Sequence, residues 1–230
     1  QLPPRVSGTT VIDSTHGDFL LRTLAISSLF IALAMRYLYV SSEWRHAITT
    51  FARDLTTGTL TFVEAIEDGG TDSQGNVIDL LRRAKASAIS PDGLHVYVPS
   101  FGDDAVTVFS RDVQTGVLTF VEVLVHEGTD SQGNFLERLS AGTHVTVSPD
   151  GQHVYVTGAP FAPVDLRDWI TVFERDAGTG QITLVESLIE DGTDSQGNPI
   201  EGLAEPAWIT VSPDGQHVYE IGRASCRERV

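Results

Sequence analysis

Three short motifs each occur three times in the sequence at the same spacing, and this internal repetition limits the possible fold more than any other feature. Each motif recurs after 58 residues and then after 64. The motifs are Ser-Pro-Asp-Gly at Ser90, Ser148 and Ser212, Phe-x-Arg-Asp at Phe51, Phe109 and Phe173, and Thr-Asp-Ser-Gln-Gly-Asn at Thr71, Thr129 and Thr193. Such a period is the signature of an array of equal supersecondary units. The six additional residues of the third unit fall within 157–169.

Each repeat unit is predicted to contain four short strands. In one unit, the runs that alternate in hydrophobicity or are rich in β-branched residues are 144–147, 153–157, 169–175 and 181–187, as is typical of strands. The Pro-Asp-Gly sequence after Ser148 is turn chemistry, because proline fixes φ and glycine accepts a positive φ. Four antiparallel strands repeated at a fixed period indicate an all-β fold, a partial β-propeller of four-stranded antiparallel blades with about three full blades plus remnants.

The repeat consensus resembles a known family. The pattern SPDGxHVYV, followed by a loop and then by VTVFxRDxxTGxLTFVE, is similar to the lactonase family of seven-bladed β-propellers, also described by its YVTN-type repeats. The resemblance covers roughly residues 37–219. It implies the propeller fold, and it implies lactone hydrolysis or a related reaction as one activity, while many propellers with this consensus act in binding. A fold alone does not establish a function.

The repeat divides the chain into three regions. Residues 37–219 contain the predicted blades, and residues 1–36 resemble a remnant of a preceding blade with an irregular apolar insertion at 28–35. Residues 220–230, EIGRASCRERV, interrupt the third HVYV-like run and resemble a translated sequencing adapter, so we expect a non-native tail. We expect no signal peptide and no membrane insertion, since the most apolar run, 23–35, is too short to span a bilayer. We expect a fragment of a ring that self-associates through exposed blade faces.

The charge of the chain excludes several classes of partner. There are 31 Asp and Glu against 15 Lys and Arg, and the net charge is -16. This balance opposes binding to nucleic acid and to anionic membranes. One cysteine cannot form an internal disulfide. Acidity and the habit of the family favour an extracytoplasmic location, periplasmic or secreted.

One face of the predicted blades varies from unit to unit. Successive strands run in opposite directions, so the Pro-Asp-Gly and Thr-Gly turns lie on one face and the remaining loops on the other. On this second face, the loop face, the segments 42–46, 100–104 and 158–168 differ from one another. Loops that vary on a uniform scaffold commonly carry function. We therefore expect the loop face to bind a small molecule or a protein.

His144 is the candidate catalytic residue. It stands four residues before Ser148, where the other units have Ala86 and Trp208. In the lactonase family a Pro-Arg-His sequence often occupies this place, and only the histidine matches here. Lactone hydrolysis needs a base that activates water and a cation that holds the developing oxyanion. The resemblance therefore implies His144 as the base with Arg167 or Arg45 as its electrostatic partner.

Simpler roles for these residues stay open. His144 would also fit a partly buried, hydrogen-bonded side chain, and Arg167 would also fit an ion pair on an exposed loop. The acidic loops 67–76, 127–134 and 190–198 offer oxygen ligands for Ca²⁺, but they lack the alternating carboxylates of a calcium loop. An Asx turn capped by glycine explains them. We expect no metal site and no organic cofactor.

Taken together, these patterns favour a lactonase-like β-propeller that acts as a ligand- or protein-binding scaffold through its loop face. The alternative is an enzyme with a His/Arg site, either a lactone hydrolase similar to the 6-phosphogluconolactonases or a carboxymuconate-cyclase-like enzyme.

Overall fold

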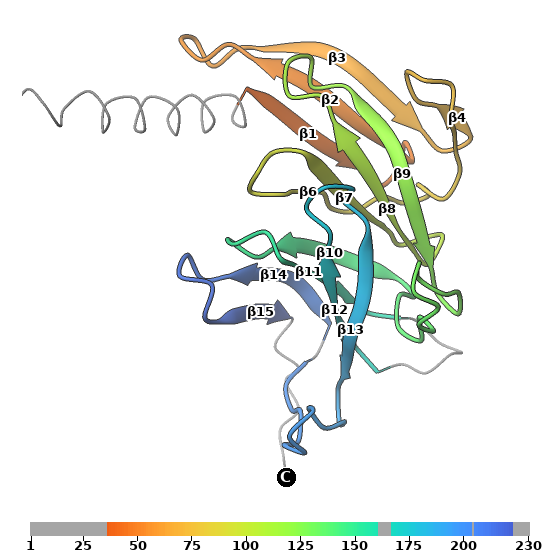
Figure 1. Ribbon diagram of the computed structural model, residues 1–230, viewed down its shortest axis with the longest axis vertical. Coiled ribbons are helices and arrows are strands. Elements are labelled where there is room, and N and C mark those ends of the chain that lie inside the picture. Colours follow the sequence, from red (N-terminus) through yellow and green to blue (C-terminus); the bar gives the residue numbers. More distant parts are fainter. Residues whose placement is uncertain (1–35, 161–166, 204, 223–230) are drawn as a thin grey trace, which may run out of the picture.

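The computed structural model describes residues 36–160, 167–203 and 205–222, and within them every regular element is a β-strand. The main strands form antiparallel sheets that follow one another like the blades of a fan (Figure 1). This arrangement confirms the predicted all-β fold with four-stranded antiparallel blades. In the described part of the chain, no helix is long and apolar enough to cross a membrane.

Four sheets make up the fan, and the strands of each sheet lie in chain order. The first sheet contains β1 (Tyr37–Ser42), β2 (Ala47–Arg53) and β3 (Leu60–Glu67). The second contains β6 (Ala88–Ile89), β7 (His95–Ser100), β8 (Ala105–Arg111) and β9 (Leu118–Val125). The third contains β10 (Gly142–Val147), β11 (His153–Gly158), β12 (Trp169–Arg175) and β13 (Ile182–Ile189). The fourth contains β14 (Pro206–Val211) and β15 (Val218–Gly222), and a small ribbon of β4 (Gly70–Thr71) and β5 (Val77–Ile78) follows the first sheet.

The described residues thus form two complete blades, one sheet of three strands and one of two. The predicted boundaries of the regions 1–36 and 220–230 stay predictions. The apolar insertion at 28–35 and residues 223–230 lie outside the described residues. Glu220 to Gly222, the first residues of the predicted tail, continue β15 and pair with β14.

The Ser-Pro-Asp-Gly motif forms the turn that its sequence predicts. In the second sheet, the Ser90 hydroxyl donates to Asp92 Oδ1 over 2.5 Å and accepts a hydrogen bond from the N–H of His95 over 3.0 Å. Gly93 has a φ of +74°, which glycine adopts without steric cost. The same hydrogen bonds recur after Ser148 and Ser212. The aspartate of this motif therefore has a structural role.

The core lies between neighbouring sheets. The cluster between the first and second sheets includes Ile48, Ile66, Phe109 and Leu118. The cluster between the second and third sheets includes Tyr97, Leu124, Val154, Phe173 and Ile182. Full burial of one such side chain contributes about 1.5–3 kcal/mol. Each blade is therefore stabilised mainly by the blade beside it.

Candidate functional site

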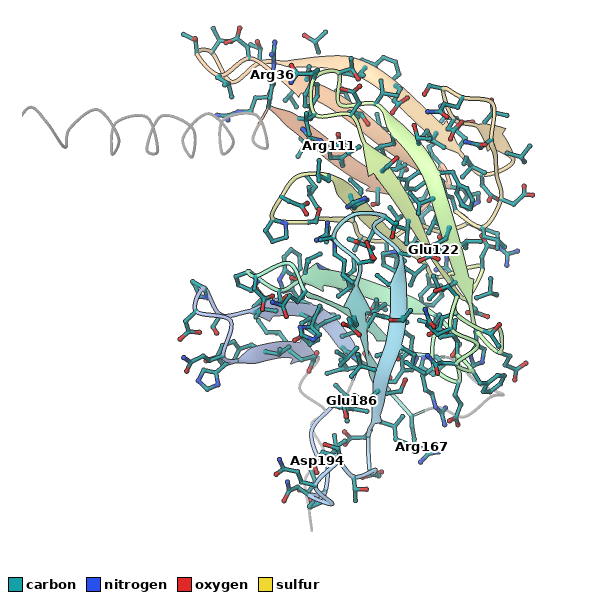
Figure 2. The ribbon with its side chains drawn as sticks, in the orientation of Figure 1. Arg36, Arg111, Glu122, Arg167, Glu186 and Asp194 are labelled. Atoms are coloured by element: carbon teal, nitrogen blue, oxygen red, sulfur yellow. The ribbon has the colours of Figure 1, made fainter. Side chains whose placement is uncertain are left out.

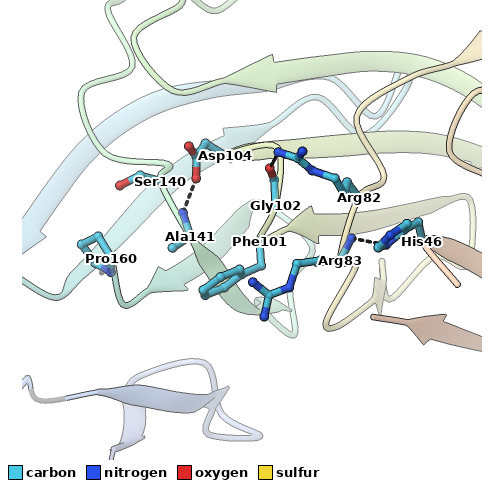
Figure 3. A pocket seen from close by; sticks show the side chains of 9 residues that line it. All are labelled: His46, Arg82, Arg83, Phe101, Gly102, Asp104, Ser140, Ala141 and Pro160. Carbon is cyan, nitrogen blue, oxygen red and sulfur yellow. Dashed lines mark hydrogen bonds between the residues drawn. The ribbon is translucent and has the colours of Figure 1, made fainter. Parts of the chain in front are cut away.

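A pocket of about 540 Å³ opens at the loop face, between the first three sheets (Figure 3). Its walls come from the β1–β2 and β7–β8 loops, from the end of β11, and from the links that enter β6 and β10. The lining residues are His46, Arg82, Arg83, Phe101, Gly102, Asp104, Ser140, Ala141 and Pro160. The loop face, where the sequence predicts ligand contacts, is therefore hollowed at this place.

Arg83 and Phe101 form a cation–aromatic pair at the pocket. The guanidinium carbon of Arg83 lies 4.3 Å from the centroid of the Phe101 ring, and Lys85 Nζ lies 4.1 Å from the same centroid. Glu43 Oε1 accepts a hydrogen bond from Arg83 Nε over 3.0 Å and lies 3.9 Å from Lys85 Nζ. The carboxylate and the ring thus hold two cations in place.

Arg82 is held by the neighbouring loop. Its Nε lies 3.2 Å from Asp103 Oδ1, and its backbone N–H donates to Asp103 Oδ2 over 2.6 Å. The Arg82 guanidinium also donates to the carbonyl oxygen of Gly102 (Figure 3). The pKa of the Asp103 carboxyl lies above its usual value, because the effect of burial exceeds the opposing effect of the hydrogen bond from Arg82 N–H. The Arg82 side chain is 57% exposed, so a ligand can reach it.

His46 occupies a position that holds aspartate in the other units. Its Nδ1 accepts a hydrogen bond from the N–H of Arg83 over 3.0 Å, and Arg83 has a positive φ of 58°. The two equivalent bonds run from Ala141 N–H to Asp104 Oδ1 over 2.7 Å and from Glu205 N–H to Asp168 Oδ2 over 2.6 Å. Because Nδ1 of His46 accepts, the neutral ring carries its proton on Nε2. A hydrogen-bond donor therefore stands where the other units have a carboxylate.

His144, the predicted base, lies half-buried on β10. Its ring centroid lies 4.2 Å from that of Trp208 on β14, and its Nδ1 accepts a long hydrogen bond of 3.4 Å from the N–H of Ile209. Burial lowers the pKa of His144, so the ring is neutral at pH 7, the form that a general base requires.

The two predicted arginine partners lie elsewhere on the loop face. Arg45 is exposed in the β1–β2 turn, where its N–H donates to Ser42 Oγ over 3.3 Å. Arg167 lies two residues before β12 (Figure 2). Neither arginine, nor His144, is among the nine residues that line the pocket. Their catalytic roles stay predictions.

Part of the pocket could have been found from the sequence. His46, Phe101 and Asp104 lie in the variable loops 42–46 and 100–104 that the sequence singles out. Arg82 and Arg83 were missed because they lie in the link between two blades. Their signal is the run Arg-Arg-Ala-Lys, a basic cluster in an otherwise acidic chain.

The acidic loops are Asx turns, as predicted. Asp72 Oδ1 accepts from the N–H groups of Gln74 and Asn76, both over 2.9 Å. Asp72 Oδ2 reaches the next sheet and accepts from the N–H of Phe120 over 2.9 Å. Although burial raises the pKa of Asp72, these hydrogen bonds lower it below its usual value. Among the described residues, no group of three or more His, Cys, Asp or Glu side chains is arranged to hold a metal ion.

Comparison with known proteins identifies relatives of this chain. The model of a family described as "Lactonase, 7-bladed beta-propeller" matches residues 22–136. The 6-phosphogluconolactonase of Enterobacter sp. (strain 638) is 25% identical over 168 residues, which cover 71% of this chain and 43% of the relative. The 6-phosphogluconolactonase of Bacillus subtilis (strain 168) is 29% identical over 158 residues, which cover 67% of this chain and 38% of the relative. The chain thus spans less than half the length of these curated relatives.

Solved structures share the fold. A crystal structure from Bacteroides uniformis ATCC 8492 superposes with a TM-score of 0.57 at 17% identity, covering 82% of this chain and 44% of that chain. A protein from Lactobacillus plantarum superposes with a TM-score of 0.55 at 20% identity, covering 81% of this chain and 48% of that chain. At these identities the likeness shows the propeller fold alone.

Proposed function

Because the chain belongs to the lactonase family of seven-bladed β-propellers, we propose that its loop-face pocket binds an anionic sugar lactone and the sugar acid formed from it. The curated relatives carry the name 6-phosphogluconolactonase, and a phosphorylated sugar lactone is an anion of this class. This proposal takes up the enzymatic alternative that the sequence left open.

The observation that carries the proposal is the convergence of hydrogen-bond donors in one pocket. Two guanidinium groups line it together with His46, whose Nδ1 accepts from Arg83 N–H and whose Nε2 is therefore a donor. A guanidinium presents a planar fork of N–H donors that matches phosphate and carboxylate oxygens. The ion pairs of Arg82 with Asp103 and of Arg83 with Glu43 orient both guanidinium groups before a ligand arrives.

Hydrolysis of a lactone at this pocket requires two further groups, one that stabilises the oxyanion and one that takes a proton from the attacking water. Water attacks the lactone carbonyl carbon, the ring C–O bond breaks, and the leaving alkoxide takes up a proton to give a hydroxy acid. His46 Nε2–H and the arginines can stabilise the oxyanion of the tetrahedral intermediate. Asp104 can take the proton from water, since its Oδ1 is bonded to Ala141 N–H and its Oδ2 has no hydrogen-bond partner among the described residues. His144 is the second candidate base.

A binding measurement tests the pocket first. We expect 6-phosphogluconate to bind the chain in a calorimetric titration. Replacement of Arg83 by glutamine should weaken binding by about 10- to 150-fold, which corresponds to the loss of a charged hydrogen bond of about 1.5–3 kcal/mol. The control Arg36→Gln, exposed before β1 at the opposite end of that strand from the pocket, should bind like the unmodified chain. Equal affinities for all three proteins would contradict the proposal.

A rate measurement identifies the base. Hydrolysis of 6-phosphogluconolactone is followed against its spontaneous rate, with Asp104→Asn and His144→Gln as variants. The asparagine keeps the oxygen that accepts from Ala141 N–H but cannot take a proton. Loss of turnover in Asp104→Asn alone would place the reaction in the pocket, whereas loss in His144→Gln alone would move it to β10.

The second candidate is a binding scaffold, the role that the sequence analysis favoured. The specific observation behind it is that Arg82 and Arg83 are each already paired with a carboxylate, so neither needs a substrate anion for its charge balance. Binding of the sugar acid with no turnover of the lactone would support this scaffold role.

A further inference from the structure

One position of the repeat keeps its place in the fold in three units but changes its residue in the first. It is the last residue before the second main strand of each of the first three sheets, and it is occupied by His46, Asp104 and Asp168. Its carbonyl oxygen accepts a hydrogen bond of 2.8–2.9 Å from the backbone N–H that lies 22 residues further on, at Asp68, His126 and Glu190. The backbone at this position is therefore bonded in the same way in all three units.

The side chain at this position also has the same structural role in each unit. His46 Nδ1, Asp104 Oδ1 and Asp168 Oδ2 accept from the backbone N–H groups of Arg83, Ala141 and Glu205, and Figure 3 shows the first two of these bonds. All three donor residues have a positive φ, so the hydrogen bond holds a backbone conformation that residues with a Cβ rarely adopt. Because aspartate performs this role in two units, the fold does not require a histidine at position 46.

The residue at position 46 makes a difference on the side of the pocket. His46 lines the pocket together with Arg82 and Arg83. An aspartate at this position would use one carboxylate oxygen for the N–H of Arg83 and would leave a second oxygen, with a negative charge, in the pocket. The histidine leaves Nε2–H, which is a donor on a neutral ring. In the first unit, a donor thus replaces an acceptor at the place where the two guanidinium groups gather.

The same pocket also contains the aspartate form of this position. Asp104 lines the pocket, and it lies apart from His46 there (Figure 3). The pocket therefore has a donor side, formed by His46, Arg82 and Arg83, and an acceptor side at Asp104. A ligand that carries an anionic group and several hydroxyl groups, as a sugar acid does, matches both sides.

We infer that His46 is the specificity-determining residue that makes the loop-face pocket select an anionic ligand, with the anionic group turned toward the two arginines and away from Asp104. This inference rests on the proposed function, because it concerns the ligand of the same pocket. The repeat's own aspartate at position 46 would present a like charge to that group and weaken its binding.

Two replacements of nearly equal shape test the inference. His46→Asn and His46→Asp both offer Oδ1 to the N–H of Arg83, and both residues adopt a positive φ, which is 54° at His46, more readily than most. They differ in the remaining group, which is an NH₂ donor in asparagine and a charged oxygen in aspartate. In a calorimetric titration, 6-phosphogluconate should bind to His46→Asp at least about 10-fold more weakly than to His46→Asn, as expected for the loss of one charged hydrogen bond.

Arg36→Gln is the control for net charge. It lowers the net charge by one, as the step from asparagine to aspartate does, but Arg36 is exposed before β1, at the other end of this strand from the pocket. This variant should bind like the unmodified chain. Urea unfolding of both His46 variants shows whether they keep the fold.

The outcomes separate this inference from the proposed function. No binding to the unmodified chain, or no effect of Arg83→Gln, would refute the proposed pocket. If the chain binds 6-phosphogluconate and depends on Arg83, but His46→Asp binds as well as His46→Asn, only the selection by His46 is overturned. An equal loss of affinity in Arg36→Gln would overturn it too, because the effect would then come from net charge. Loss of the fold in His46→Asp alone would assign the histidine to stability and would also overturn the inference.

Discussion

Replacement of Glu122 by alanine should destabilise the junction between the second and third sheets, while the same change at Glu186 should not. Glu122 Oε1 accepts from the N–H of Ile182 over 2.8 Å, and its Oε2 accepts from Gln181 Nε2 over 3.2 Å. Alanine would leave the N–H of Ile182, a fully buried residue, without an acceptor. An unsatisfied buried donor costs about 1–3 kcal/mol. A chain of this size loses about 2–4 °C in Tm per kcal/mol, so Glu122→Ala should lower Tm by about 2–12 °C.

Glu186 provides the matched control, because it occupies the same repeat position and its carboxylate makes no hydrogen bond among the described residues. In dilute solution, Glu186→Ala should change the free energy of unfolding by less than about 0.5 kcal/mol, as is usual for surface substitutions. Glu122→Gln should retain most of the stability, since an amide oxygen still accepts from Ile182 N–H. Urea unfolding of the three variants at low protein concentration gives the comparison. Equal losses at Glu122 and Glu186 would refute the junction assignment.

Three further predictions concern the same junctions. The Arg175 side chain is 1% exposed and joins two sheets, so Arg175→Gln should lower the free energy of unfolding by about 3–5 kcal/mol. The Arg53 side chain makes no hydrogen bond or ion pair among the described residues, so Arg53→Gln should change the free energy of unfolding little when measured in urea. Gly180→Ala should lower Tm far more than Gly58→Ala. Both glycines have a positive φ, but a Cβ at Gly180 would overlap the ring of His95, whereas a Cβ at Gly58 would meet no atom within 4 Å. Burial raises the pKa of the Asp130 carboxyl, but its hydrogen bonds lower it further, so the folded-state pKa lies below the usual value. Asp130 therefore stabilises the folded chain at pH values above its unfolded pKa, and this stabilisation is lost as the pH falls through the folded pKa. Asp130→Asn should make the free energy of unfolding depend less on pH in the acid range, and an unchanged dependence would contradict this prediction.

The repeat unit and its turns could be predicted because they depend on local chemistry. The predicted strand 144–147 corresponds to β10, which begins two residues earlier at Gly142, and 181–187 corresponds to β13, which extends to Ile189. The Asx turn at Asp72 also follows from its own loop. That the same side chain reaches Phe120 in the next sheet could not be read from the loop, because this contact depends on how the blades pack.

The pocket shows the same limit. His46 and Asp104 belong to loops that differ between units, and this difference marked them in the sequence. Arg83 enters the pocket because a backbone hydrogen bond to His46 holds it at a positive φ. The local sequence around Arg83 does not predict this positive φ. The convergence of segments as distant as His46 and Pro160 is a property of the assembled fan.

The junction carboxylates bind backbone N–H groups of the next blade and not its side chains. Glu64 therefore accepts from the N–H of a leucine, Leu118, and Glu122 accepts in the same way from the N–H of an isoleucine, Ile182. At the aspartate contact, Phe120 in the second sheet corresponds to Leu184 in the third. These hydrogen bonds do not depend on the side chain of the residue that donates its backbone N–H. Blades of this chain can thus diverge, duplicate or be exchanged during evolution without a matching change in their neighbours.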